Sequence, residues 1–206
     1  SEAEEISFIY NQPLWLVNLW MNEMGKDKTI DLCAWFNEQP RLTARINTIK
    51  VSIEDCLKEL QDLGWTVEQD TYIPEVVYID GHQGHLEKAK PVIDGHITFM
   101  DKASMLVAHV VDPQPGERIL DCCAAPGGKS MHMASLMNNT GAIMSCDIYD
   151  HKLELMNQNA ERLGVSIVST KLQDGRYLPD NWKEQFDRVL VDAPCSGLGI
   201  LQKKVD

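Results

Sequence analysis

Strands and helices alternate along the second half of this chain, and this alternation constrains the fold more than any other feature of the sequence. Apolar stretches of strand length are separated by segments with the apolar spacing of helices. Strands that alternate with helices form a parallel sheet. The sequence therefore predicts a Rossmann-like, doubly wound α/β domain. The predicted elements are strands at 118–123, 142–147, 166–172 and 186–192, with helices at 129–138 and 150–164.

The first half of the chain has a different pattern, which indicates a small α+β subdomain. Ser52 is a predicted N-cap, and Gly64 is the predicted end of the same helix. Residues 81–96, rich in Gly, His, Lys and Pro, are predicted to form a loop, and a helix is expected at 100–112. We expect a subdomain at 1–91 and a core domain at 92–206. The predicted elements of the first half are helices at 11–25, 31–40 and 52–64, and strands at 41–49, 66–70 and 75–80.

Composition excludes several classes of protein. The chain has 44% apolar residues, 24% charged residues and a formal charge of −12. It contains no apolar run of membrane-spanning length, and "SEAEEISFIYNQP" lacks the order of a secretion signal, so we expect a cytoplasmic protein. The acidic balance argues against nucleic-acid binding through bulk charge, so any such contact must come from local residues.

The cysteines and histidines do not indicate a metal site. None of the six cysteines belongs to a C-x-x-C pair, so a disulfide framework or a zinc knuckle is not expected. His82 and His85, in "HQGH", have no partner cysteines and are predicted to lie in a solvated loop. We therefore expect no metal.

The loop "AAPGGKS" follows the first predicted strand of the core domain and has three possible interpretations. A Walker loop fits at Gly128-Lys129-Ser130, but Cys123 stands where its first glycine is required. A dinucleotide fingerprint is incomplete, because only Gly127 and Gly128 are present. The third interpretation is the nucleoside pocket of an S-adenosylmethionine methyltransferase.

Three carboxylates follow the predicted strands of the core domain. Asp147 ends the second strand, where it can accept hydrogen bonds from ribose hydroxyls in either a dinucleotide or S-adenosylmethionine. Asp174 follows the third strand and Asp192 ends the fourth. Because parallel strands end at one edge of the sheet, these side chains are expected to line one ligand crevice.

Several segments together resemble the Sun/Fmu (RsmB-like) family of RNA cytosine-C5 methyltransferases. They are "DCCAAPGGKS", "SCDIYDHKLELMNQNAERLG", "QDGRYLP" and "FDRVLVDAPCSGLG", with "LTARINTIK" and "ITFMDKASMLVAHVVDPQPGERILD" similar to the family's small RNA-contacting subdomain and its junction. The resemblance implies S-adenosylmethionine as cofactor and RNA, most specifically 16S ribosomal RNA, as substrate. It also implies ribose binding by Asp147, adenine-side binding by Asp174, and a place for Asp192 between the cofactor amine and the target base. The residues that it places around the methionine and ribose are Cys123, Ala124, Ala125, Pro126, Gly127, Gly128 and Lys129.

Cys195, in "DAPCSG", has two chemical interpretations. A thiolate that adds to C6 of cytosine activates C5 for methyl transfer, and Cys195 beside Pro194 is a candidate for that nucleophile. The resemblance implies instead that the nucleophile belongs to a later T-C-S motif and that Cys195 helps product release. A small buried thiol is the third alternative.

No T-C-S motif occurs in the 206 residues. We therefore expect a truncated methyltransferase core, with the first four strands of its sheet, that binds cofactor but is inactive alone. An exposed edge at Val189, Leu190 and Val191 is expected to promote dimerisation or aggregation.

RNA contacts are expected from a few cationic side chains, although a solvated surface is the simpler interpretation of each. The candidates are Arg41, Arg45 and Lys50, with Lys203 and Lys204 as weaker ones. Two other functions stay open: a non-catalytic RNA-binding or assembly module with a nucleoside pocket, and an NAD-dependent oxidoreductase. The oxidoreductase is weakened by the missing G-x-G-x-x-G fingerprint.

Overall fold

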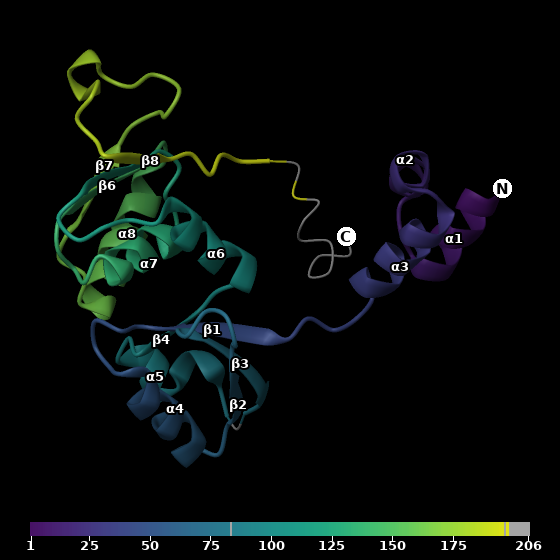
Figure 1. The fold of residues 1–206 in the computed structure, drawn as a ribbon, viewed down its shortest axis with the longest axis horizontal. Coiled ribbons are helices and arrows are strands. Elements are labelled where there is room, and N and C mark those ends of the chain that lie inside the picture. Colours follow the sequence, from purple (N-terminus) through teal and green to yellow (C-terminus); the bar gives the residue numbers. More distant parts are fainter. Residues whose placement is uncertain (83, 196, 198–206) are drawn as a thin grey trace. The chain divides into compact units, whose positions relative to one another are not determined.

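The computed structural model describes residues 1–82, 84–195 and 197, and these form two compact units. One unit runs from Arg41 to Pro194, and the other contains residues 1–40 together with Cys195. Helices and strands of both are labelled in Figure 1. In the part of the chain that the structure describes, no helix is both long enough and apolar enough to cross a membrane.

The N-terminal unit consists of α1 (Glu2–Tyr10), α2 (Leu14–Met24) and α3 (Lys26–Phe36). Leu16, Val17 and Cys33 are fully buried between these helices, and the rings of Trp20 and Phe36 stack at 5.6 Å. The predicted second helix is confirmed with different bounds, since it begins at Lys26 and ends before Pro40. Helix α1 was not expected, because its mixed acidic and apolar residues show no clear periodicity.

The larger unit begins with an antiparallel sheet of strand order β2-β3-β1-β4. Its core contains Ala44, Ile46, Leu60 and Trp65, which pack together with residues of β3. Ser52 caps α4 as expected, since its Oγ accepts a hydrogen bond from Asp55 N at 3.1 Å. The elements are β1 (Leu42–Ile46), α4 (Ile53–Asp62), β2 (Thr66–Gln69), β3 (Val76–Gly81), η1 (Leu86–Lys88), α5 (Lys90–Ile93) and β4 (Ile97–Phe99).

Two details of this sheet differ from the prediction. Residues 81–96 are not wholly a loop, because η1 and α5 form there around Pro91. The three-residue strand β4 then pairs with β1 and completes the sheet beyond residue 91. A strand of three residues has too few alternating positions to give a sequence signal. The predicted domain boundary between residues 91 and 92 stays a prediction.

The rest of the unit is the expected Rossmann-like fold, a parallel sheet of order β7-β6-β5-β8. Helices α6, α7 and α8 pack against it, and the core includes Ile119, Met133, Met137 and Ile143. The elements are α6 (Lys102–Val111), β5 (Arg118–Asp121), α7 (Gly128–Leu136), β6 (Ala142–Asp147), α8 (Asp150–Leu163), β7 (Val168–Leu172), η2 (Asp180–Trp182) and β8 (Arg188–Leu190).

The chain continues from β5 to β6 and β7 on one side and returns to β8 on the other. The loops after β5 and β8 therefore diverge at a topological switch point, where open α/β sheets bind ligands. This topology places the glycine loop and the segment from Val191 to Pro194 at the same end of two neighbouring strands.

Hydrogen bonds join the two sheets within this unit. The buried side chain of Asn47 donates from Nδ2 to the carbonyl oxygens of Gly95 and Leu163, both at 2.8 Å. The hydroxyls of Thr48 and Ser135 lie 2.8 Å apart. These contacts link the end of β1 to helices α7 and α8.

Candidate functional site

The glycine loop lies between the end of β5 and the first turn of α7. Gly127 has φ +97°, a conformation that favours glycine, and a Cβ atom there would lie 3.0 Å from Met156 Cγ. The backbone N–H of Gly127 donates to Ala124 O at 2.7 Å, and that of Ala124 donates to Cys146 O at 2.8 Å. The loop is thereby held against β6 and leaves the first N–H groups of α7 without helical partners.

An ion pair joins the loop to the neighbouring strand end. Lys129 Nζ lies 2.5 Å from Asp192 Oδ2, and the two side chains are 23% and 46% exposed. The structure thus brings together two residues that the sequence predicts to share a site.

A cavity of about 410 Å³ adjoins this pair. The predicted residues Cys123, Ala124, Ala125, Pro126, Gly128, Lys129 and Asp192 line part of it. The rest of its wall comes from β4, the first turn of α6, the two residues between them, and α8. Sequence reasoning missed these residues, although the segment "ITFMDKAS" carried part of the family resemblance. They are Thr98, Phe99, Met100, Asp101, Ser104 and Asn159.

Asp147 and Asp174 lie outside the wall of this cavity. Asp147 ends β6 and is nearly buried, with its Oδ1 accepting a hydrogen bond from Tyr149 N at 3.1 Å. Asp174 follows β7, and a hydrogen bond from the Arg176 guanidinium lowers its pKa to about 2. A Cβ on Gly175 would lie 3.1 Å from Cys122 Cβ, so the loop of Asp174 packs closely against the end of β5.

The buried carboxyl group of Asp121, which was not predicted from the sequence, anchors the start of α7. Asp121 is 1% exposed, and burial raises its pKa to about 6 against the opposing hydrogen bond from Ser130. Its Oδ2 accepts from Ser130 Oγ at 2.7 Å, and Ser145 Oγ lies 2.8 Å from Ser130 Oγ. This group ties the end of β5 to the first turn of α7.

The cysteines fall into three environments, since Cys123, in the cavity wall, is half-buried. Cys33, Cys56, Cys122 and Cys146 are buried, and burial raises the pKa of each thiol, to about 12 for Cys56 and Cys146. These four are unsuitable as thiolate nucleophiles at neutral pH. Cys195 is exposed, so the alternative that it is a buried structural thiol is wrong.

The predicted RNA contacts have different surroundings. Arg45 is 1% exposed, so the expectation that it lies on the surface is wrong. Its face of β1 is covered by α6 and by groups of α7, which no local pattern could show. Lys50 Nζ donates to the carbonyl oxygens of Asp94 and Arg162, where its charge stabilises the C-terminus of α8.

Arg41 is 43% exposed and forms ion pairs with Asp80 and Glu68, while its guanidinium lies 4.1 Å from the Tyr78 ring centroid. An RNA contact by Arg41 or Lys50 stays a prediction. Lys203 and Lys204 lie outside the described residues.

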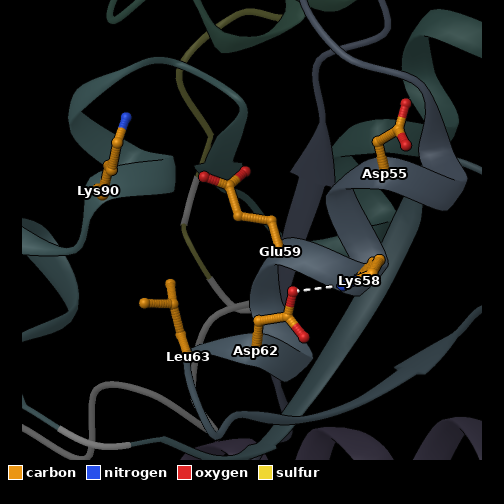
Figure 2. A pocket seen from close by; sticks show the side chains of 6 residues that line it. All are labelled: Asp55, Lys58, Glu59, Asp62, Leu63 and Lys90. Atoms are coloured by element: carbon orange, nitrogen blue, oxygen red, sulfur yellow. Dashed lines mark hydrogen bonds and ion pairs between the residues drawn. The ribbon is translucent and has the colours of Figure 1, made fainter.

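Two other groups of titratable side chains do not line the cavity at the glycine loop. A hollow of about 330 Å³ beside α4 is lined by charged side chains and Leu63. Lys58 and Asp62, one turn apart on α4, form an ion pair of 2.6 Å in its wall (Figure 2). Among the described residues, one group of side chains has the composition of a metal site: Glu75, His109 and His132. The loop histidines His82 and His85 do not belong to it. His82 lies 6.1 Å from Trp65 between ring centroids.

Comparison with known proteins agrees with this geometry. Residues 108–206 match the family model for the 16S rRNA methyltransferase RsmB/F, and residues 12–84 match the ferredoxin-like domain of the same methyltransferases. The probable ribosomal RNA small subunit methyltransferase B of Bacillus subtilis is 36% identical over 95% of this chain and 44% of its own length. The chain belongs to the RsmB/F methyltransferase family.

Two further proteins are similar to this chain. The probable ribosomal RNA small subunit methyltransferase B of Synechocystis is 36% identical over 96% of this chain. A solved structure of a methyltransferase homologue from Pyrococcus horikoshii has a TM-score of 0.85 at 25% identity, covering 98% of this chain and 65% of that one. The chain spans 44% of the length of each of the two curated relatives.

Proposed function

We propose that this chain provides the S-adenosylmethionine-binding core of an enzyme that methylates C5 of a cytosine in RNA, specifically 16S ribosomal RNA. The observation that carries the proposal is the Lys129–Asp192 pair, which joins the "AAPGGK" loop to the "DAPC" segment beside one cavity. Membership of the RsmB/F family supports the same reaction class.

The residues present fit this cofactor. Gly127 lets the loop turn at φ +97° where an added Cβ would strike Met156, and the first turn of α7 offers N–H groups to the methionine carboxylate. Asp147, at the tip of β6, would accept hydrogen bonds from the ribose hydroxyls, and Asp174 would face the adenine. Bound there, S-adenosylmethionine supplies an electrophilic methyl group.

The chain's own residues would position the target cytosine. Asp192 would lie between the cofactor amine and the target base, with Lys129 holding its carboxylate in place. The target cytosine must be unstacked to reach the site, because C5 and C6 are inaccessible inside a base stack. Arg41 and Lys50 would contribute phosphate contacts on the antiparallel sheet.

Cys195 is proposed to assist release of the product rather than to attack first. The covalent cysteine–C6 adduct would form with a thiol of a T-C-S motif, which this sequence does not contain. The 206-residue chain alone is therefore expected to bind cofactor without transferring methyl groups.

Two measurements test the proposal. Calorimetry should detect S-adenosylmethionine binding to the chain, weakened at least tenfold by Asp147→Ala but not by Asp180→Ala, an exposed carboxylate in η2. Transfer of tritiated methyl groups to 16S ribosomal RNA should require a chain extended through a T-C-S motif. Absence of cofactor binding at millimolar concentration would favour the RNA-binding or assembly module. Transfer by the 206-residue chain that Cys195→Ala abolishes would make Cys195 the nucleophile.

A further inference from the structure

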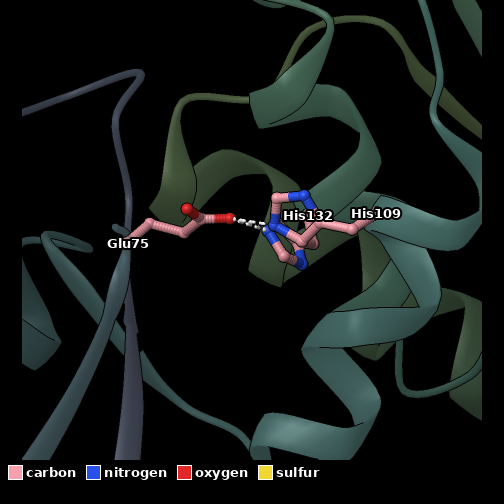
Figure 3. Close-up of side chains that lie close together, drawn as sticks. All are labelled: Glu75, His109 and His132. Atoms are coloured by element: carbon pink, nitrogen blue, oxygen red, sulfur yellow. Dashed lines mark hydrogen bonds and ion pairs between the residues drawn. The ribbon is translucent and has the colours of Figure 1, made fainter. Parts of the chain in front are cut away.

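Three polar side chains from three separate elements meet between the two sheets (Figure 3). Glu75, in the turn before β3, directs its carboxylate toward His109 of α6 and His132 of α7. Its Oε1 lies 2.6 Å from His109 Nε2 and 2.8 Å from His132 Nε2. Glu75 is 7% exposed and His132 is 1% exposed. One carboxylate oxygen thus connects the antiparallel sheet to two helices of the parallel-sheet domain.

The protonation states in this cluster follow from burial and charge. Burial alone would raise the pKa of Glu75, but hydrogen bonds from the two imidazoles outweigh it and lower the pKa to about 2. Burial lowers the pKa of His132 to about 4, and the charge of buried Arg45 acts in the same direction. Near neutral pH an ionised Glu75 therefore accepts a hydrogen bond from Nε2–H of a neutral His132.

The same donor set of two imidazoles and a carboxylate is one that zinc uses, so a metal ion is the competing interpretation. Two features disfavour it. Arg45 already places one buried cation beside Glu75, and a divalent ion would add to that charge. Ligation through Nε2 would also move the His132 proton to Nδ1, which is buried without a hydrogen-bond partner among the described residues, whereas ligating imidazoles donate that proton to an acceptor.

The position of His132 connects this cluster to the cofactor loop. His132 lies on α7 three residues after Lys129, one turn along the helix from the loop. From the parallel sheet, Asp121 holds the same first turn through Ser130. The N-terminal half of α7 is therefore held from both sheets, by Ser130 in its first turn and by His132 in its second.

We propose that Glu75 and His132 are positioning residues, which hold the first turn of α7 and its Lys129 in place from the antiparallel sheet. This inference rests on the proposed function, because the group being positioned belongs to the proposed cofactor site. The antiparallel sheet also carries the predicted RNA contacts. The Glu75–His132 bond thus gives that sheet a direct mechanical connection to the cofactor loop.

The test compares S-adenosylmethionine affinity, thermal stability and amide hydrogen exchange in the 206-residue chain. Glu75→Ala and His132→Leu should weaken cofactor binding about tenfold and speed exchange of the hydrogen-bonded α7 amides from Met131 onward. His132→Gln, whose amide N–H can reach Glu75, should restore affinity to within about threefold of the original chain. The matched control is Glu59→Ala, which breaks the 2.7 Å contact between Glu59 Oε2 on α4 and His96 Nδ1 before β4 and should change neither affinity nor exchange in α7.

Each failure has a distinct signature. If the original chain binds S-adenosylmethionine and Glu75→Ala binds it equally well with unchanged exchange in α7, the positioning role is wrong although the proposed function stands. If the original chain does not bind the cofactor, the proposed function fails, and hydrogen exchange still decides whether Glu75 holds α7. His109→Ala, at a more exposed member of the cluster, provides a milder variant if Glu75→Ala does not fold. If added zinc raises the melting temperature of the original chain but not that of His109→Ala, the cluster is a metal site and the positioning role is wrong.

Discussion

Lys129 Nζ and Asp192 Oδ2 lie 2.5 Å apart and connect the ends of two neighbouring parallel strands. The pair brings a cation from the glycine loop and a carboxylate from the "DAPC" segment to one cavity. Because both side chains are partly exposed, the pair contributes little to stability, about 1 kcal/mol at most. Its geometry therefore points to a role in the site rather than in folding.

Replacement of this pair should affect function more than stability. We expect Asp192→Asn to reduce methyl transfer by an enzyme extended through a T-C-S motif at least about a hundredfold. The free energy of unfolding should change by less than about 1 kcal/mol. The control is Asp180→Asn, which removes a more exposed ion pair, in which Asp180 Oδ1 and Lys183 Nζ are 2.8 Å apart. A transfer rate for Asp192→Asn equal to that of the control would contradict the assignment.

The glycine loop should tolerate no side chain at position 127. Gly127→Ala combines a left-handed backbone with a 3.0 Å contact to Met156 Cγ, so we expect a loss of about 1–3 kcal/mol in stability and weaker cofactor binding. Gly116→Ala is a matched control, since Gly116 has φ +91° with nothing within 4 Å of the added Cβ. Denaturant unfolding and calorimetry measure the two effects. If the two variants bind the cofactor equally well, the conformation of Gly127 does not support cofactor binding.

Two buried groups should give opposite pH dependences of stability. The pKa of His132 is lowered from 6.5 to about 4, so the unfolded chain binds the extra proton and stability rises with pH between about 4 and 6.5. The pKa of Asp121 is raised from 3.8 to about 6, so stability falls over nearly the same interval. Each effect is about 3 kcal/mol, and the two largely cancel in the original chain.

Single variants should expose each effect. Asp121→Asn removes the fall, so its unfolding free energy should rise between pH 4 and 6.5, and His132→Gln should show a fall instead. The neighbouring charges of Glu75, Arg45 and His109 remain in both variants. Urea unfolding at several pH values measures this, and parallel pH profiles for the two variants would show that the assignment is wrong.

The edge of the parallel sheet is the expected site of self-association. Strand β8 pairs with β5 alone among the described strands, and Val189 and Val191 are 53% and 64% exposed. Val189→Lys should reduce concentration-dependent association, because a charged side chain blocks pairing of edge strands. Val110→Lys, at an 83% exposed position on α6, is the control. Light scattering that shows a monomer at all concentrations would remove the basis for this expectation.

The sequence by itself determined the parallel sheet, the glycine loop and the strand-end carboxylates. These features depend on local periodicity, on backbone freedom at Gly127 and on the rule that parallel strands end together. It also placed the Ser52 cap, because capping involves residues only three positions apart.

Only the tertiary structure shows that Arg45 is buried and that Glu75 contacts His132. A strand pattern shows which residues share a face but not what covers that face. The helix that brings His132 to Glu75 begins more than fifty residues later in the chain. Three features arise only when the two sheets pack together: the burial of Arg45, the protonation state of His132, and the contact that holds α7. Each depends on groups that lie far apart in the sequence.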